Sequence, residues 1–196
     1  MGNALTIKGL TSARECEEIA HWAREARVLL EVGRLQGRTT AVIASAMRSD
    51  AKLVSIDHHR GDRNTGETSF EECKRNVETF VEGKDVTLCN EAFEEVLPAL
   101  REQFDFVFYD AMHTTEACEK FWECVVGKLQ ARCVLLYDDA DWKEMWRLGE
   151  LARAAGFREV TRFALQRNEG GKDDQAAELA PRGDYTVAVY LREEEV

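Results

Sequence analysis

The chain is organised around the stretch Val28-Leu29-Leu30-Glu31-Val32-Gly33-Arg34-Leu35-Gln36-Gly37-Arg38-Thr39-Thr40. Its apolar run ends in an acid and a glycine, a second glycine follows, and a helical apolar pattern begins at the two threonines. Strand, glycine turn and helix in this order present backbone N–H groups and a helix N-terminus to a ligand in α/β sheets. Glycine suits such a turn because it tolerates positive φ and lets a ligand approach the main chain closely. The stretch therefore predicts the first half of a nucleotide-type pocket.

The composition is that of one soluble globular domain, with 196 residues, 44% of them hydrophobic and 32% charged. The net charge of −11 argues against a nucleic-acid partner, because such binding needs phosphate-neutralising lysines and arginines. No apolar run approaches the roughly 20 residues that span a bilayer, and no signal peptide is apparent. The six cysteines lack C-x-x-C spacing, which favours reduced thiols. We therefore expect a cytoplasmic protein with no membrane partner.

Strand and helix patterns alternate along most of the chain. We expect strands over 27–32, 52–57, 86–89, 106–110, 133–137, 157–167 and 185–192, and helices over 12–26, 39–48, 69–80, 91–100, 114–129 and 142–155. Alternating units with continuous apolar strands predict a mostly parallel sheet with helices on both faces. The last two strands have no helix between them, so we expect an antiparallel hairpin. The prediction is one α/β domain over 1–196, Rossmann-like and seven-stranded, with an N-terminal helix in 9–26, a βα core over 27–156 and the hairpin over 157–192.

Acidic residues stand at the ends of four of the first five predicted strands: Glu31, Asp57, Asp110 and the pair Asp138-Asp139. The carboxyl ends of parallel strands form the edge where open α/β sheets bind ligands. Asp57 lies 24 residues beyond Gly33, a spacing typical of an acid that binds ribose hydroxyls, although a solvated strand-end aspartate is the alternative. The turn lacks G-x-G-x-x-G, which speaks against a nicotinamide dinucleotide.

The motif Glu-Val-Gly-x-x-x-Gly-Arg-Thr-Thr resembles motif one of the class I S-adenosylmethionine-dependent methyltransferases. Its closest form is a small family, methyltransferase family 24, whose members read E-I-G-x-x-x-G-x-S-T. Residues 56–63 resemble that family's segment after the second strand, and residues 105–116 resemble its F-I-D-G-D-H-S-Y-E motif with one glycine and one carboxylate missing. The resemblance covers about residues 9–192.

The resemblance implies a cofactor site for S-adenosylmethionine. Glu31 and Gly33 would meet its methionyl portion, Asp57 its ribose, and residues 90–92 its adenine edge. The full predicted set is Glu31, Gly33, Gly37, Thr39, Asp57, His58, Asn90, Glu91, Ala92 and Asp110.

A second group of acids suggests a metal ion. Asp110, Asp138 and Asp139 come from two neighbouring strand ends, and carboxylates so placed can bind Mg²⁺ or Ca²⁺. Residues 137–142 also resemble the acidic pair of cation-dependent O-methyltransferases, in which the metal lowers the pKa of the acceptor hydroxyl. The alternative is that these aspartates cap helices.

Asp110 and His113 are the predicted catalytic residues. His113 lies just past the fourth predicted strand, and a histidine can act as a general base because its ordinary pKa lies near neutral pH. The alternative is that it caps a helix. Trp142 and Trp146, four residues apart, would form either a core face or a wall of the substrate site. The loop over 168–184 would be a lid or plain disorder.

Together these features predict a methyltransferase that moves a methyl group from S-adenosylmethionine to the hydroxyl of a small-molecule acceptor. One alternative is a non-catalytic binding or assembly module of the same fold, and the other is a nicotinamide-dependent oxidoreductase. A homo-oligomer stays open, because the sequence does not fix the oligomeric state.

Overall fold

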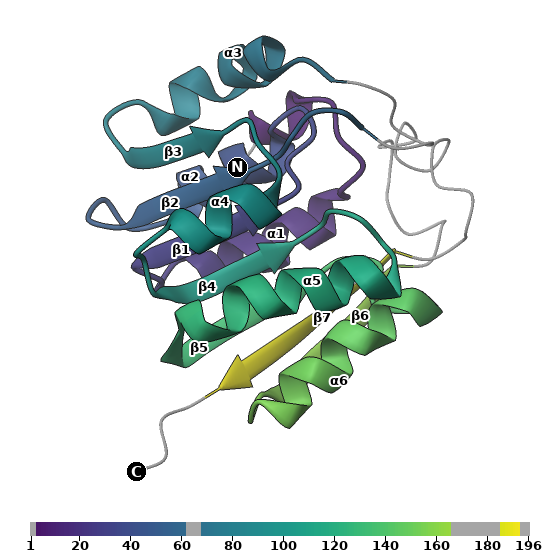
Figure 1. Ribbon diagram of the computed structural model, residues 1–196. Coiled ribbons are helices and arrows are strands. Elements are labelled where there is room, and N and C mark those ends of the chain that lie inside the picture. The colour runs from purple at the N-terminus through teal and green to yellow at the C-terminus, as the bar shows by residue number, and fades with distance from the viewer. Residues whose placement is uncertain (1–2, 62–67, 166–184, 193–196) are drawn as a thin grey trace.

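The computed structural model describes residues 3–61, 68–165 and 185–192 (Figure 1). The helices are α1 (Ala13–Ala23), α2 (Arg38–Ala46), α3 (Phe70–Val81), α4 (Phe93–Ala99), α5 (Thr115–Val125) and α6 (Trp146–Ala154), with 3-10 turns η1 (Ala4–Thr6), η2 (Val126–Lys128) and η3 (Lys143–Met145). The strands are β1 (Val28–Val32), β2 (Lys52–Ile56), β3 (Asp85–Cys89), β4 (Phe104–Tyr109), β5 (Leu129–Tyr137), β6 (Arg158–Leu165) and β7 (Tyr185–Arg192). Within these ranges, every helix is too short or too polar to cross a membrane. The loop over 168–184, predicted as either a lid or plain disorder, lies outside them.

The strands form one sheet in the order β3-β2-β1-β4-β5-β7-β6. β1 to β5 run parallel, and β7 is antiparallel to both β5 and β6. The predicted seven-stranded, mostly parallel sheet with a C-terminal antiparallel pair is therefore confirmed. Strand order reverses between β1 and β4, and such a switch point is where open α/β sheets bind their ligands.

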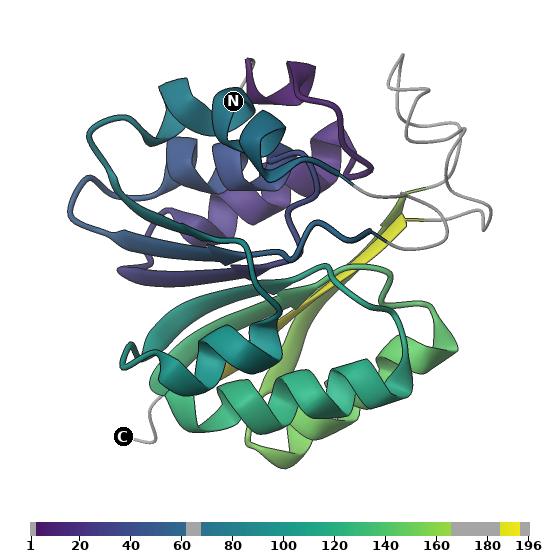
Figure 2. The ribbon, with the colours of Figure 1, turned by 45° about the horizontal axis from the view of Figure 1, so that its top comes forward.

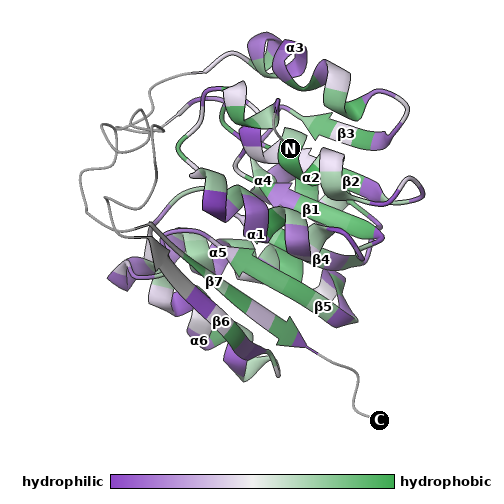
Figure 3. Ribbon diagram, turned by 180° about the vertical axis from the view of Figure 1, so that it is seen from behind, coloured by the Kyte–Doolittle hydropathy of each residue, from purple (hydrophilic) through white to green (hydrophobic). Residues whose placement is uncertain are grey.

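Helices cover both faces of the sheet, as expected (Figure 2). α1, α2 and α3 pack on one face and α4, α5 and α6 on the other, each over its own buried apolar cluster. Alternate strand residues serve the two clusters, so Leu29 packs with the first set of helices and its neighbour Leu30 with the second. The central strands are accordingly mainly hydrophobic, with a few polar segments (Figure 3).

The largest differences from the predicted bounds lie near residue 129. The helix predicted over 114–129 ends at Val125, one 3-10 turn follows, and β5 begins at Leu129 rather than at residue 133. Leu129 is buried and pairs with Phe104 across a register shift in the β4–β5 ladder. Because its apolar side chain also continues the helical period, the local pattern cannot distinguish the two states.

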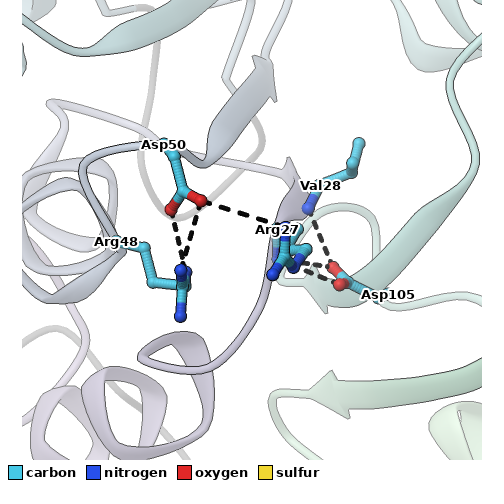
Figure 4. A network of polar contacts seen from close by, with 5 residues as sticks. All are labelled: Arg27, Val28, Arg48, Asp50 and Asp105. Atoms are coloured by element: carbon cyan, nitrogen blue, oxygen red, sulfur yellow. Dashed lines mark hydrogen bonds and ion pairs between the residues drawn. The ribbon is translucent and has the colours of Figure 1, made fainter.

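At the edge of the sheet where the parallel strands begin, Asp50 and Asp105 accept hydrogen bonds from nearby donors (Figure 4). Asp105 accepts the backbone N–H of Arg27 at 3.1 and 2.9 Å and that of Val28 at 2.9 Å. Asp50 accepts two bonds from the Arg48 guanidinium, at 2.8 and 3.2 Å. These contacts fix the start of β1 beside β4, and with it the register of the carboxyl edge.

Candidate active site

The turn between β1 and α2 needs both of its glycines. Gly33 has φ +90°, and a Cβ there would lie 1.8 Å from the carbonyl oxygen of Asp110. Gly37 has φ +95° and begins α2 as its N-cap, and a Cβ there would lie 2.4 Å from Val77 Cγ1. The positive φ expected from the sequence is confirmed at both positions. The turn from β1 therefore packs directly against the chain leaving β4 at the switch point.

Glu31 lies fully buried beneath this turn. Its Oε2 accepts hydrogen bonds from Thr40 Oγ1 and Ser55 Oγ, each at 2.5 Å. Its Oε1 has no hydrogen-bond partner among the described residues. Burial raises the pKa of the Glu31 carboxyl, against the lowering effect of the hydroxyls of Ser55, Thr39 and Thr40. Thr39, another predicted cofactor residue, is thus a buried neighbour of this acid.

Asp57, the predicted ribose ligand, holds the turn. Its Oδ2 accepts the backbone N–H of Arg34 at 2.9 Å and of Leu35 at 2.8 Å, and its Oδ1 accepts that of His59 at 2.7 Å. Burial acts to raise the pKa of Asp57, but these backbone donors outweigh it and hold the pKa below its usual value. Contact with a ribose stays a prediction.

Arg34 and His59 were not among the predicted cofactor residues. The Arg34 guanidinium is buried, and it donates to the carbonyl oxygens of Ser55 at 2.5 Å and Cys89 at 2.7 Å. It also donates to His59 Nε2, at 3.2 Å from Nε and 3.1 Å from Nη2. Arg34 stands at an unspecified position of the G-x-x-x-G turn, so no local signal marked it.

The predicted adenine edge lies beyond β3. Asn90 and Glu91 are exposed, and Ala92 is the N-cap residue of α4. His58 accepts the backbone N–H of Arg60 at its Nδ1, 3.0 Å away. These residues lie along the same carboxyl edge as Asp57, and a base-binding role for them stays a prediction.

The predicted catalytic residues come together at the ends of β4 and β5. His113 Nε2 lies 3.7 Å from Asp110 Oδ1 and 3.5 Å from Asp139 Oδ2. The imidazole packs on the indole of Trp142 with ring centroids 5.1 Å apart. His113 precedes Thr114, and it is Thr114 whose hydroxyl caps α5. The capping alternative for His113 is therefore wrong, and the ring is held between two carboxylates.

Asp138 turns into the interior, toward α1. Its carboxyl lies close enough to that of Glu15 for the two charges to interact, and Glu15 Oε2 accepts the N–H of Ser12 at 2.6 Å in the capping box of that helix. Burial raises the pKa of Glu15 to about 7, and burial together with the charges of Glu15, Asp110 and Asp139 raises the pKa of Asp138 well above its usual value. Sequence reasoning found the capping box but not this contact, because Glu15 lies far from Asp138 along the chain.

This arrangement does not favour the predicted metal ion. Within the described ranges, no group of three His, Cys, Asp or Glu side chains is placed to hold one ion. Binding of Mg²⁺ or Ca²⁺ by Asp110, Asp138 and Asp139 stays a prediction, and we derive no step from it.

The two tryptophans of the predicted substrate wall differ in environment. Trp142 is half-buried against the core and packs on His113, whereas Trp146 is 53% exposed at the start of α6. Met112, beside His113, is 46% exposed. α5 and α6 lie side by side (Figures 1 and 2), and Trp146 is the first residue of α6.

Comparison with known proteins identifies related sequences and folds. A family model described as Methyltransferase domain matches residues 30–140, more than half of the chain. Among curated proteins, none matches significantly in sequence.

Several solved structures share the fold. The O-methyltransferase TomG from Streptomyces achromogenes, involved in tomaymycin synthesis and solved in complex with SAM, is 20% identical, with a TM-score of 0.67 over 93% of this chain and 81% of that one. An O-methyltransferase from Bacillus cereus in complex with SAH is 18% identical, with a TM-score of 0.65 over 96% and 86%. The N-methyltransferase NodS from Bradyrhizobium japonicum WM9 is 12% identical, with a TM-score of 0.63 over 92% and 94%. At these identities the likeness concerns the fold.

Proposed function

This chain belongs to the class I S-adenosylmethionine-dependent methyltransferases, and from that premise we propose that it transfers the methyl group of S-adenosylmethionine to a hydroxyl oxygen of a small molecule. When bound, the cofactor supplies an electrophilic methyl group on a sulfonium sulfur. The protein's contribution is position and a deprotonated acceptor, because methyl transfer is an in-line displacement.

The observation that carries the proposal is the unpartnered oxygen of Glu31. A buried carboxylate with one oxygen lacking a donor is costly unless a cation or a donor is brought to it. The α-ammonium of S-adenosylmethionine carries both the positive charge and the N–H donors that Glu31 Oε1 lacks. The hydroxyls of Thr40 and Ser55 hold the other oxygen, so the carboxylate is already oriented for such a contact.

His113 is the proposed general base. The acceptor O–H would give its proton to the imidazole of His113, and the freed oxygen would bond to the methyl carbon as the carbon–sulfur bond breaks. The products are a methyl ether, S-adenosylhomocysteine and a protonated imidazole. Asp110 and Asp139, within 3.7 and 3.5 Å of Nε2, would stabilise the imidazolium.

Isothermal titration calorimetry with S-adenosylmethionine and S-adenosylhomocysteine, with and without Mg²⁺, tests the cofactor. We expect both to bind the wild-type protein, and Glu31→Gln to lose roughly 10- to 100-fold in affinity because a charge-assisted contact becomes neutral. Binding of neither compound, or of NAD instead, would overturn the proposal. Cofactor binding of equal affinity with and without Mg²⁺ would contradict only the predicted metal site.

Turnover separates an enzyme from a binding module. Asp110→Asn should reduce methyl transfer while leaving cofactor affinity within about threefold. The acceptor atom is tested with matched hydroxyl and amine compounds and a radiolabelled methyl group. Labelling of the amines alone would contradict oxygen as the acceptor.

A further inference from the structure

The loops that follow β1 and β2 are locked together by two buried side chains. Arg34 from the first loop is 3% exposed and His59 from the second is 6% exposed. Arg34 donates two hydrogen bonds to His59 Nε2. Its guanidinium also donates to the carbonyl oxygens of Ser55, near the end of β2, and Cys89, at the end of β3. One guanidinium thus joins the ends of three strands.

The same two loops hold backbone in an unfavourable conformation. Leu35 has φ +51° and His59 has φ +55°, and residues other than glycine rarely adopt such values. Asp57 accepts the backbone N–H of each, and thereby ties both strained residues to one carboxylate. Strain of this kind persists only where the surroundings over-determine the conformation, and it gathers at binding sites.

We infer that Arg34 and His59 form a latch that holds the glycine turn in the shape that receives the cofactor. They are positioning residues, because they act through the turn and take no part in methyl transfer. The inference rests on the proposed function, in that it takes the turn to be the cofactor site. It adds residues that the motif does not specify.

The contacts define the protonation state of the latch. Arginine can only donate, so His59 Nε2 must be an acceptor and the ring proton sits on Nδ1, which donates to Thr68 Oγ1 at 2.9 Å. The other neighbours of the ring are the Asp57 carboxylate, the His58 ring and the Phe70 ring at 5.6 Å.

Acid should open the latch. Burial lowers the pKa of His59, the charges of Arg34 and His58 lower it further, and Asp57 opposes them. The ring is therefore neutral at neutral pH. Below its lowered pKa, a proton on Nε2 would remove the acceptor and face the guanidinium with a second positive charge.

The test combines matched variants with two readouts. His59→Gln keeps an acceptor for Arg34 and a donor for Thr68 but cannot titrate, whereas His59→Leu and Arg34→Met each remove the contact. His21→Gln and Arg101→Met, at exposed positions away from the site, are the controls. The dissociation constant of S-adenosylhomocysteine is measured by calorimetry over a pH series from about pH 8 downward, and kcat is measured at saturating cofactor.

We expect Arg34→Met and His59→Leu to weaken binding at about pH 8 by about tenfold or more, with kcat within about twofold of wild type. As the pH falls below the lowered pKa of His59, wild type and both controls should lose affinity, and His59→Gln should lose much less. The inference would be overturned if Arg34→Met bound S-adenosylhomocysteine as tightly as wild type. It would also be overturned if His59→Gln lost as much affinity in acid as wild type.

Hydrogen–deuterium exchange of the ligand-free protein separates this inference from the proposed function. The amides of residues 33–37 should exchange faster in Arg34→Met than in Arg101→Met, while those of β4 and β5 stay unchanged. Unchanged exchange of the turn would contradict the latch whether or not a cofactor binds. If wild type bound neither compound, the proposed function would fail, and the positioning of the cofactor with it.

Discussion

The two halves of the carboxyl edge satisfy their acids in opposite ways. At the ends of β1 and β2, Asp57 accepts three backbone N–H groups and its pKa is held low. At the ends of β4 and β5, Asp138 and Glu15 are buried against each other and burial raises the pKa of both. Three backbone donors hold Asp57 as an anion, whereas burial favours the protonated forms of Glu15 and Asp138, although Glu15 also accepts one backbone N–H. Glu31, also in the first half, is the exception, because burial raises its pKa despite its hydroxyl donors. Asp57 is therefore a preformed anion, whereas several acids crowd together in the second half.

The most severe way to break the first half is Gly33→Ala. The new Cβ would lie 1.8 Å from the Asp110 carbonyl oxygen, so turn and strand end must separate. We expect a loss of about 3 kcal/mol or more in the free energy of unfolding, measured by urea denaturation. Gly83→Ala is the control, because its φ is +72° but no atom lies within 4 Å of the new Cβ. Equal losses in both would mean that backbone strain alone matters.

His113→Gln should impair catalysis at the ends of β4 and β5 without affecting cofactor binding at the ends of β1 and β2. Removing the base is expected to reduce kcat by about 100-fold or more, because general-base catalysis contributes on that scale. The dissociation constant of S-adenosylmethionine should stay within about threefold of wild type. His21→Gln, on the exposed side of α1, should leave both unchanged. A large loss of cofactor affinity would place His113 in the cofactor site instead.

Glu15→Gln removes one of the two buried carboxyls at the ends of β4 and β5, and so tests whether burial raises the pKa there. The pKa of Glu15 is raised from 4.5 to about 7, so the folded state binds more protons than the unfolded state in that window. The stability that this proton gives is full below about pH 4.5 and is lost as pH rises toward 7. The variant should therefore be more stable than wild type at about pH 8, by about 3 kcal/mol, with the advantage shrinking toward pH 4.5.

Calorimetric melting of both proteins across this range measures the effect. Glu17→Gln, on the exposed side of the same helix, is the matched control and should show no such trend. A Glu15→Gln protein that is less stable than wild type at every pH would mean that the pair with Asp138 is stabilising as it stands.

Glu91→Gln should have the smallest effect. The side chain is exposed beyond β3, where water screens its charge. Cofactor affinity by calorimetry should change by less than about threefold. A larger loss would give the adenine edge a share of the binding that we propose for Glu31.

Local pattern predicted most of the fold. Apolar runs and glycines located the strands, and Ser12 with Glu15 predicted the capping box that begins α1. Acids at strand ends predicted which side chains meet at one edge, because parallel strands bring those ends together. Leu129 was misplaced since an apolar residue fits a helix face and a buried strand equally well.

The parts that could not be predicted depend on contacts between distant segments. Arg34 stands at a position that the motif leaves free, and its partners at Ser55, His59 and Cys89 come from other loops and strands. The burial of Asp138 against Glu15 joins a strand end to the first helix. No periodicity or spacing carries such information. The pairing of Glu31 with Thr40 and Ser55 likewise depends on two elements beyond β1.

The place of β7 in the sheet determines the order in which the molecule can be assembled. β7 comes last of the seven strands in the chain, yet it lies between β5 and β6. Its final residue Arg192 pairs with Cys133 and donates to the carbonyls of Leu129 and Gln130 at the start of β5. During synthesis β6 therefore leaves the ribosome before the strand that joins it to the rest of the sheet. The βα units from β1 to β5 can form as they emerge, while this end of the molecule must wait for the last strand to be made.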